Sequence, residues 1–598
     1  MFSQRAQEIF AHVNQGGINR QWDAVQILKS LGKDVESEQE RDALEMLAGA
    51  ISMSFNKKKQ SFTPLFESAD GRRSFSMDDI SNDDIAIIKE AMLYFSLPFI
   101  RAQLAHILWL ITEEYQCAQI AVDEYLKVFD NEFNPQNWTT CYDAIQIAYD
   151  ISMKLGRKTE YFKKVFQTIK DSLLELDGTD PLFLSLRLIR LIHKEADSKT
   201  NEAMLTIIEK LANRNINVAN SEYHLAEETF NVHELLLKRL NKSSEINTAK
   251  LNLANYYEKH AALLSEAGQD FRAIILLKKA CVLCSCVDKE KTLKLRARLE
   301  ELQKLASDNM VAIPFQFDIS SMREAISVLY DGLSFQETIV QLGRTAATCQ
   351  VNEVRKSVIE EQKEFVFQSL FSNSYLNNQG QTICELPPLS RTDPEKDQDL
   401  FFKHMVRYVS KRREIGETIA LNLGLEYLRR FGDFAVDELD FLVNNNPIIP
   451  ENREEILKEG LHLALSGRMY AALHILLPQT EQIFRNLVKM CGDSVTFLND
   501  DGTESIKTLS LLFKSEKLKE AYSEDIIFTF QSIMDVPAGE NLRNMIAHGV
   551  LDPQSGNGGS ALCFVCLLIK LLCLYSPAVQ PIIRRLINRE KAVDGDEV

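Results

Sequence analysis

Glycine and proline are scarce in this sequence, at 24 and 15 of 598 residues. Strand-like alternation of apolar and polar residues is also rare. Apolar residues instead recur at helical spacing in most segments, as in residues 88–111. Few positions therefore interrupt a helix, and few segments have the pattern of a half-buried strand. The sequence predicts an all-α protein.

Positive charge is also in deficit, because 68 Lys and Arg stand against 85 Asp and Glu, for a formal net charge of -17. Such a surface repels nucleic acid on average, so any RNA contact needs a local basic site or pocket. The eleven cysteines have no regular spacing, which argues against a disulfide framework. The N-terminus lacks the apolar core of a signal peptide.

Long apolar runs are few. The most apolar one, residues 561–577, is short for a membrane span and contains Lys570. We interpret it as a buried helix of a bundle. Together with the missing signal peptide, this predicts a cytoplasmic protein without membrane contact.

Motifs for metal or phosphate-transfer chemistry are incomplete. Residues 281–286 have Cys-x-x-Cys spacing but no second ligand pair, so buried thiols are expected there and at Cys563 and Cys566. Residues 494–505 are similar to the strand end of aspartyl-phosphate enzymes, but Asn499 replaces the nucleophile. A turn between two short strands or helices is the better interpretation. No glycine-rich phosphate loop is present, and we expect neither a metal nor a cofactor.

The first part of the chain, residues 1–310, has the pattern of stacked helix pairs. Residues 256–283 combine two helical segments, small residues and a glycine-containing turn, as in a degenerate tetratricopeptide (TPR) unit. Residues 101–129 follow the same pattern without the glycine. The sequence predicts a TPR-like helical array whose concave face binds a protein partner. Helical packing without a ligand is the alternative.

The remaining chain divides at an irregular segment. Residues 311–400 are predicted as a helical connector that ends in a linker at 371–400, where Asn, Gln, Pro and charged residues cluster. A short extended segment is expected around Thr382–Leu386. Helical spacing resumes in residues 401–598, which form the predicted C-terminal domain.

One segment of that domain, residues 539–549 (GENLRNMIAHG), concentrates polar side chains suited to chemistry. On a helix, Arg543 and His548 are about 140° apart around the axis. Histidine exchanges protons near neutral pH, and an arginine stabilises a phosphorane-like transition state, so this pair suits RNA cleavage without metal. Asn544 can hold a phosphate oxygen or orient the histidine. The alternative is a helix C-terminus, with the histidine in the last turn and Gly549 as the cap.

Residues 543–549 fit the RNxxxHG signature of a family of domains of unknown function, and the wider R-x4–6-H motif of the HEPN superfamily. Residues 472–487 resemble the first helix of that family, and residues 505–544 resemble its middle. The resemblance extends over residues 473–553. The positions that carry it in the first helix are Pro478, Glu481 and Arg485. It implies a C-terminal HEPN-like helical bundle.

The resemblance also implies roles for single residues. Arg543 and His548 would be the catalytic pair of a metal-independent endoribonuclease that forms a 2′,3′-cyclic phosphate, with tRNA and rRNA as candidate substrates. Asn544 would be a supporting neighbour. Glu481 would pair with Arg543, although an i,i+4 pair with Arg485 is the alternative. HEPN enzymes act as homodimers in stress and anti-phage defence, but some only bind RNA. A non-catalytic scaffold or sensor is therefore the alternative function.

The N-terminal half resembles the helical regions that accompany this domain family. The similar segments are residues 101–109 and residues 271–280. His106 departs from the pattern, because an acidic residue is expected at its position.

Overall fold

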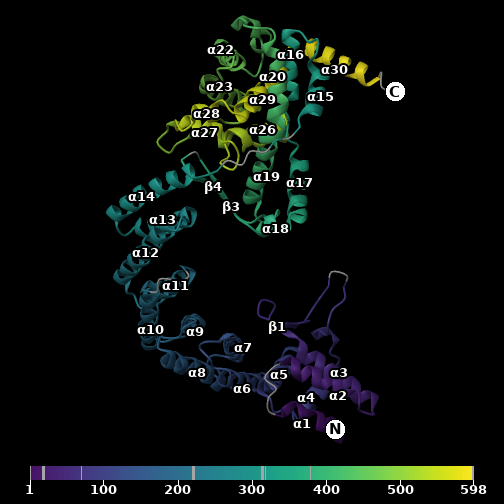
Figure 1. Cartoon of the computed structure of the whole chain (residues 1–598), viewed down its shortest axis with the longest axis vertical. Coiled ribbons are helices and arrows are strands. Elements are labelled where there is room, and N and C mark those ends of the chain that lie inside the picture. The colour runs from purple at the N-terminus through teal and green to yellow at the C-terminus, as the bar shows by residue number, and fades with distance from the viewer. Residues whose placement is uncertain are drawn as a thin grey trace. The chain divides into compact units, whose positions relative to one another are not determined.

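The predicted helical fold is confirmed (Figure 1), with 70% of residues in helices and 4% in strands. The computed structural model describes residues 2–15, 21–68, 71–217, 223–311, 316, 318–377 and 379–595. The chain divides into two compact units, Met1–Leu302 and Gln303–Val598.

The N-terminal unit is a succession of helices that pack mainly against their neighbours in sequence, most extensively α2 on α3, α5 on α6, α6 on α7 and α12 on α13. The helices are α1 (Gln4–Asn14), α2 (Gln21–Gly32), α3 (Glu38–Ser52), η1 (Met77–Asp79), α4 (Asn82–Ala91), α5 (Pro98–Thr112), α6 (Tyr115–Asn131), α7 (Thr139–Leu155), α8 (Glu160–Leu176), α9 (Leu184–Ile192), α10 (Ser198–Asn217), α11 (Tyr223–Arg239), α12 (Ser243–Glu266), α13 (Asp270–Cys284) and α14 (Lys289–Asp308). A hairpin of β1 (Ser54–Asn56) and β2 (Ser61–Thr63) follows α3.

Both predicted helix pairs in this unit are present. The pair at residues 256–283 corresponds to α12 and α13, and Gly268 in the turn between them has a φ of +70°. Glycine suits that turn because this backbone region disfavours residues with a Cβ atom. The pair at residues 101–129 corresponds to α5 and α6. Pro98 begins α5, where its missing N–H leaves no helical hydrogen bond unmade.

The C-terminal unit contains longer helices interrupted by short ones. Its helices are α15 (Ser320–Tyr330), α16 (Phe335–Thr345), α17 (Val351–Glu364), α18 (Val366–Ser369), η2 (Leu389–Arg391), α19 (Gln398–Arg412), the π-helical turn η3 (Arg413–Glu417), α20 (Thr418–Arg429), η4 (Val436–Leu439), α21 (Asp440–Val443), α22 (Glu454–Leu465), α23 (Met469–Met490), α24 (Leu509–Leu512), α25 (Glu516–Tyr522), α26 (Glu524–Met534), α27 (Leu542–Ala547), α28 (Pro553–Gly556), α29 (Gly559–Tyr575) and α30 (Gln580–Gly595).

Two antiparallel hairpins complete this unit. One consists of β3 (Asn373–Leu376) and β4 (Thr382–Leu386), and it lies in the predicted linker, where β4 coincides with the expected extended segment. The other consists of β5 (Thr496–Leu498) and β6 (Glu504–Ile506). Its turn carries Asn499, as the sequence predicted for a turn between two short strands.

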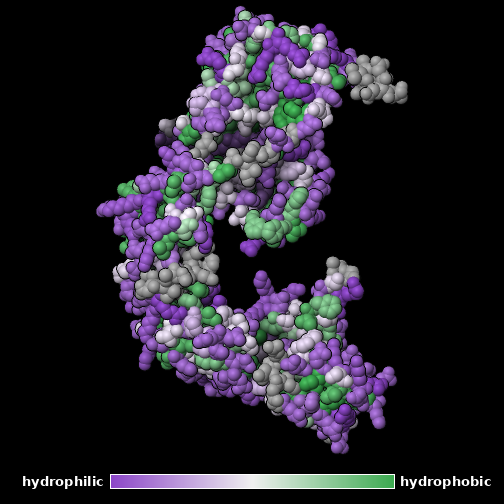
Figure 2. Space-filling view, viewed as in Figure 1, coloured by the Kyte–Doolittle hydropathy of each residue, from purple (hydrophilic) through white to green (hydrophobic). Residues whose placement is uncertain are grey.

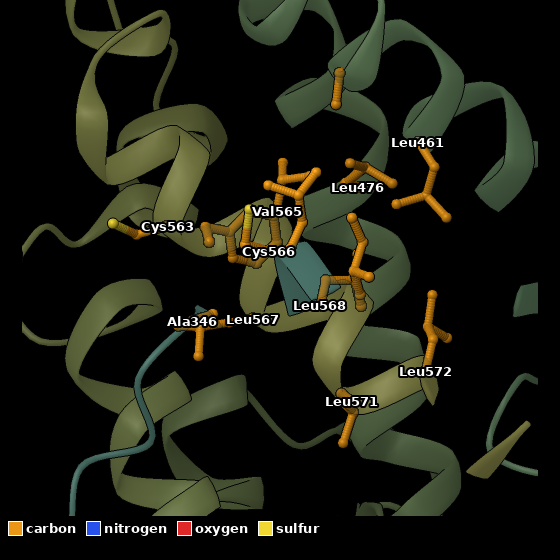
Figure 3. Packing of buried hydrophobic residues seen from close by; sticks show 14 of the residues in the cluster. Ala346, Leu461, Leu476, Cys563, Val565, Cys566, Leu567, Leu568, Leu571 and Leu572 are labelled. Atoms are coloured by element: carbon orange, nitrogen blue, oxygen red, sulfur yellow. The ribbon is translucent and has the colours of Figure 1, made fainter. Parts of the chain in front are cut away.

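Helix α29 is the centre of the core in this unit. Its apolar side chains, with Val565 and Leu568 among them, are buried on several sides against α16, α20, α23 and α26 (Figure 3). Cys563 and Cys566 are buried there, as predicted, and Cys281 and Cys284 are buried in the N-terminal unit. Cys286 is exposed, so the thiol prediction is wrong at that residue.

The predicted burial of this apolar run is confirmed. Within the described residues, Pro553–Tyr575 is the helical stretch with the length and apolar composition of a membrane span, and 67% of its most apolar window is buried inside the protein. Core helices of water-soluble proteins share these properties. Length and composition therefore do not make it a membrane segment.

Candidate functional site

The predicted catalytic segment forms the short helix α27, which begins after Asn541 in a left-handed conformation (φ 52°). Arg543 lies in its first turn, and His548 is the residue that ends it. Five residues of helix separate the two by about 7.5 Å along the axis and about 140° around it. The structure therefore places Arg543 and His548 at opposite ends of one helical segment.

The end of α27 is a Schellman cap. The N–H of Gly549 donates to the carbonyl of Ile546 at 3.0 Å, and the N–H of Val550 donates to the carbonyl of Met545 at 2.9 Å. Gly549 has a φ of +66°, the left-handed conformation that this motif requires. The alternative interpretation of the segment as a capped helix end is thus confirmed. A cap of this kind also fixes the backbone at His548.

Glu481, on helix α23, binds both of the arginines predicted for it. Arg543 Nε donates to Glu481 Oε2 at 2.9 Å, and Arg485 Nη2 donates to Glu481 Oε1 at 3.1 Å. The Glu481 and Arg485 side chains are largely buried, at 14% and 9% exposed. Arg485 also donates to the carbonyls of Val495 and Lys507. One carboxylate therefore links the Arg543 guanidinium to a buried arginine whose two terminal nitrogens are hydrogen-bonded.

Asn544 holds Arg543 from the other side. Its Oδ1 accepts from Arg543 Nη1 at 3.1 Å, while its Nδ2 donates to Asn541 Oδ1 at 2.7 Å and to the Asp535 carbonyl at 3.4 Å. Burial raises the pKa of the Asp535 side chain, and hydrogen bonding to Ser510 and the charge of Arg543 oppose that rise. Asp535 is thus an acidic neighbour of the site that the sequence analysis did not identify.

A buried ion pair anchors the loop that leads into α27. Arg413 Nη1 donates to Glu540 Oε2 at 2.7 Å, and the two side chains are only 2% and 6% exposed. Arg413 Nη2 also donates to Ser532. Glu540 belongs to the GENLRN segment, but its partner lies 127 residues away on η3, so no local pattern links them. The pair could therefore not be predicted from the sequence.

His548 is exposed to solvent, unlike the residues around Arg543. In the part of the chain that the structure describes, its imidazole makes no hydrogen bond or ion pair. Arg543 keeps 30% of its side chain exposed although two protein groups hold it. The segment thus presents a positioned guanidinium and a free imidazole to solvent. The structure brings Glu481, Asn544 and Arg543 together, but it leaves His548 outside this cluster.

Metal ligands are not grouped near these residues. Over the described ranges, no group of three or more His, Cys, Asp or Glu side chains is arranged to hold a metal ion. Two cavities of this unit lie elsewhere. One is lined by Asp525, Thr529 and Lys570, and the other by His404, Arg407 and Lys411.

Comparison with known proteins places one part of the chain in a family. Residues 3–164 match the family described as Domain of unknown function (DUF7380), so the chain carries a DUF7380 domain that runs from α1 into the first turn of α8. This is about a quarter of the 598 residues. No curated protein matches the chain. The match does not reach residues 473–553, and the HEPN interpretation of that segment stays a prediction.

Proposed function

We propose that the C-terminal unit is a metal-independent endoribonuclease of the HEPN type, with Arg543 and His548 as its catalytic pair. The observation that supports this proposal best is the bracing of Arg543. Glu481 and Asn544 fix its Nε and Nη1 atoms, yet part of the side chain remains exposed to bind an anion. A guanidinium held in advance stabilises developing phosphate charge without reorganising during the reaction.

In the proposed reaction, the ribose 2′-oxygen attacks the adjacent phosphorus and the bond from phosphorus to the 5′-oxygen breaks. A 2′,3′-cyclic phosphate and a 5′-hydroxyl result. One imidazole removes the 2′-proton and a second protonates the 5′-oxygen. His548 supplies one of them, and His548 of a second copy supplies the other, which is why we expect a homodimer through this unit. Glu481 and Asn544 act as positioning residues.

The remaining expectations follow the same proposal. RNA would be the substrate, with tRNA and rRNA as first candidates, in the cytoplasm. The N-terminal helical array would bind a protein partner that controls cleavage. A role in stress or anti-phage defence suits an enzyme of this kind.

A non-catalytic scaffold or RNA-binding protein is the second candidate, and one observation favours it. The Schellman cap and the Glu481 contacts give α27 a complete structural role without any reaction. In that case Arg543 would contribute to stability or to phosphate binding, and His548 would have no essential function.

RNA cleavage in the presence of EDTA distinguishes the endoribonuclease from the non-catalytic protein. Purified protein is incubated with tRNA and rRNA, beside His548→Asn and Arg543→Gln variants. We expect EDTA-resistant cleavage, 2′,3′-cyclic ends, and a loss of about 100-fold or more in each variant. His474→Asn is the matched control, because His474 is also an exposed histidine of this unit. Its activity should equal that of the wild type.

Two results would reject the enzyme. The first is RNA that stays equally intact with all proteins. The second is cleavage that persists in His548→Asn, since a contaminating nuclease would then be responsible. RNA binding without cleavage, weakened by Arg543→Gln alone, would support the second candidate.

A further inference from the structure

The C-terminal unit has a cleft of about 270 Å³ between α17, the β3–β4 hairpin and α19. Helix α19 lines it with His404, Arg407 and Lys411. These residues are three and four positions apart, so they lie along one face of the helix. In a chain with a net charge of -17, such a row of nitrogen-bearing side chains in one cleft is unlike the average surface. Neither Arg543 nor His548 lines it.

Two nitrogen atoms in this row are buried without a hydrogen-bond partner among the described residues, His404 Nε2 and Arg407 Nε. The His404 residue is only 9% exposed. Burial lowers the pKa of its imidazole, against a weaker opposing influence of the Pro387 carbonyl. Within the described part of the chain, the Arg407 Nε–H group is a buried donor without an acceptor, which is unfavourable. An acceptor supplied by a ligand would remove that penalty.

The charged atoms of the row have only weak protein partners. Arg407 Nη1 lies 3.2 Å from Glu414, whose side chain is 50% exposed. Lys411 Nζ lies 4.0 Å from Glu361. Ion pairs this open to solvent contribute little to stability. The Glu414 carboxylate can therefore turn to water when an anionic ligand enters, whereas Glu361 itself lines the cleft beside Lys411.

Aromatic side chains from outside α19 also line the cleft. The Arg407 guanidinium lies 4.4 Å from the centre of the Tyr375 ring. Phe365 and Phe371 line the cleft and are 46% and 54% exposed. They belong to an apolar patch over α18 (Figure 2). The exposed members of this patch are Phe365, Val366, Phe367, Leu370 and Phe371.

We propose that this cleft binds a single nucleotide. Its phosphate would contact Arg407 and Lys411, and its base would stack on Phe365 or Phe371, since aromatic rings stack on any base. Gln368 and Asn373 also line the cleft, and their amides can read the edge of a base. The volume of about 270 Å³ lies just below the usual range for ligand sites, which suits one nucleotide rather than a dinucleotide. The proposal does not depend on RNA cleavage.

Isothermal titration of the full chain with AMP tests the proposal. We expect saturable binding of one AMP per chain, and binding at least about tenfold weaker for inorganic phosphate and for adenosine alone, because each fragment uses half of the cleft. Absence of saturable AMP binding up to about 1 mM would overturn the proposal. So would phenyl phosphate that binds as tightly as AMP, because the site would then select a phosphorylated phenyl group.

Substitutions at two exposed residues of the cleft test whether AMP binds there. Lys411→Gln should weaken AMP binding at least about fivefold. Phe371→Ala should weaken the binding of AMP but not that of phosphate. Lys356→Gln is the matched control, because Lys356 is an exposed lysine of α17 with its own acidic neighbour, Glu353, and it does not line the cleft. The affinity of Lys356→Gln for AMP should stay within about twofold of the wild-type value. Equal affinities for all four proteins would place the nucleotide elsewhere and overturn the assignment.

Discussion

At the scale of single residues, Glu481 determines how Arg543 is held. Its two carboxylate oxygens bind two different guanidinium groups, and the group on Arg485 is nearly buried. The substitution Glu481→Gln keeps the size of the side chain and removes its charge. We expect the free energy of unfolding of the C-terminal unit to fall by about 2–3 kcal/mol, because both arginines then lose the carboxylate that pairs with them directly. Urea unfolding followed by far-UV circular dichroism measures the change.

A surface ion pair provides the control for Glu481. Glu516 binds Lys519 at 2.9 Å, but its side chain is 76% exposed. Glu516→Gln should change the free energy of unfolding by less than about 0.5 kcal/mol. Equal stability losses in the two variants would contradict the role assigned to Glu481.

His106 gives the N-terminal unit a dependence on pH. Its ring is 1% exposed and lies beside Trp109, and its Nδ1 is 3.3 Å from the Tyr125 hydroxyl. Burial, with a smaller effect of Lys154, lowers the pKa of His106 to about 3. The unfolded chain takes up this proton near pH 6.5, whereas the folded unit does not until about pH 3. Stability should therefore fall as the pH drops through this window, by about 2 kcal/mol between pH 7 and pH 5.

Tryptophan fluorescence during urea unfolding at pH 7 and pH 5 tests this expectation, since Trp22, Trp109 and Trp138 all lie in the N-terminal unit. His106→Gln should reduce the difference between the two pH values by about 2 kcal/mol, because its side chain does not titrate. His12→Gln, at an exposed position, should leave the difference as in the wild type. A difference that is unchanged in His106→Gln would show that other groups cause it.

Residue-scale contacts of the candidate site were predictable only where they are local or carried by a motif. The i,i+4 spacing predicts the Glu481–Arg485 pair, and the family resemblance predicts the contact of Glu481 with Arg543. Asp535 and the Arg413–Glu540 pair were not predicted. Their positions depend on how distant helices pack, and a single sequence contains no pattern for that.

At the scale of elements, the crossing of α16 over α29 depends on Gly343. A Cβ atom at this glycine would lie 2.9 Å from the backbone nitrogen of Lys570 and 3.0 Å from a methyl group of Ile569. The backbones of α16 and α29 can make room for this atom only if one of the two helices moves. Gly343→Ala should lower the free energy of unfolding of the C-terminal unit by about 1–3 kcal/mol, measured by circular dichroism in urea.

Gly416 is the matched control for Gly343. It lies in η3, and a Cβ atom there would meet no atom of the described residues within 4 Å beyond its chain neighbours and its own helical backbone. Gly416→Ala should leave stability unchanged or slightly raised, because alanine reduces the freedom of the unfolded chain. A Gly343→Ala variant as stable as Gly416→Ala would mean that the two helices separate without penalty.

Elements with a periodic pattern were predictable, and those formed by packing were not. Apolar spacing identifies α5, α6, α12 and α13, a continuous apolar run identifies α29, and Gly549 predicts the end of α27. The π-helical turn η3 has no comparable signal. It interrupts a continuous helical stretch at Arg413, whose buried side chain pairs with Glu540. Such an interruption depends on a tertiary contact rather than on local sequence preference.

At the scale of the whole molecule, the family match and the proposed sites lie in different units. The DUF7380 match lies entirely in the N-terminal unit, whereas both proposed sites lie in the C-terminal unit. Membership of the N-terminal domain in a family therefore says nothing about the chemistry proposed for Arg543 and His548. The evidence for that chemistry has to come from the C-terminal unit itself.

The two units should also unfold separately, because each has its own buried core. Tryptophan fluorescence reports only on the N-terminal unit, while circular dichroism reports on the helices of both. We therefore expect urea transitions that do not coincide for the two probes. Glu481→Gln should shift part of the circular dichroism transition and leave the fluorescence transition in place. Coincident transitions that both move in this variant would show a single cooperative unit, and stability effects in one half would then be transmitted to the other.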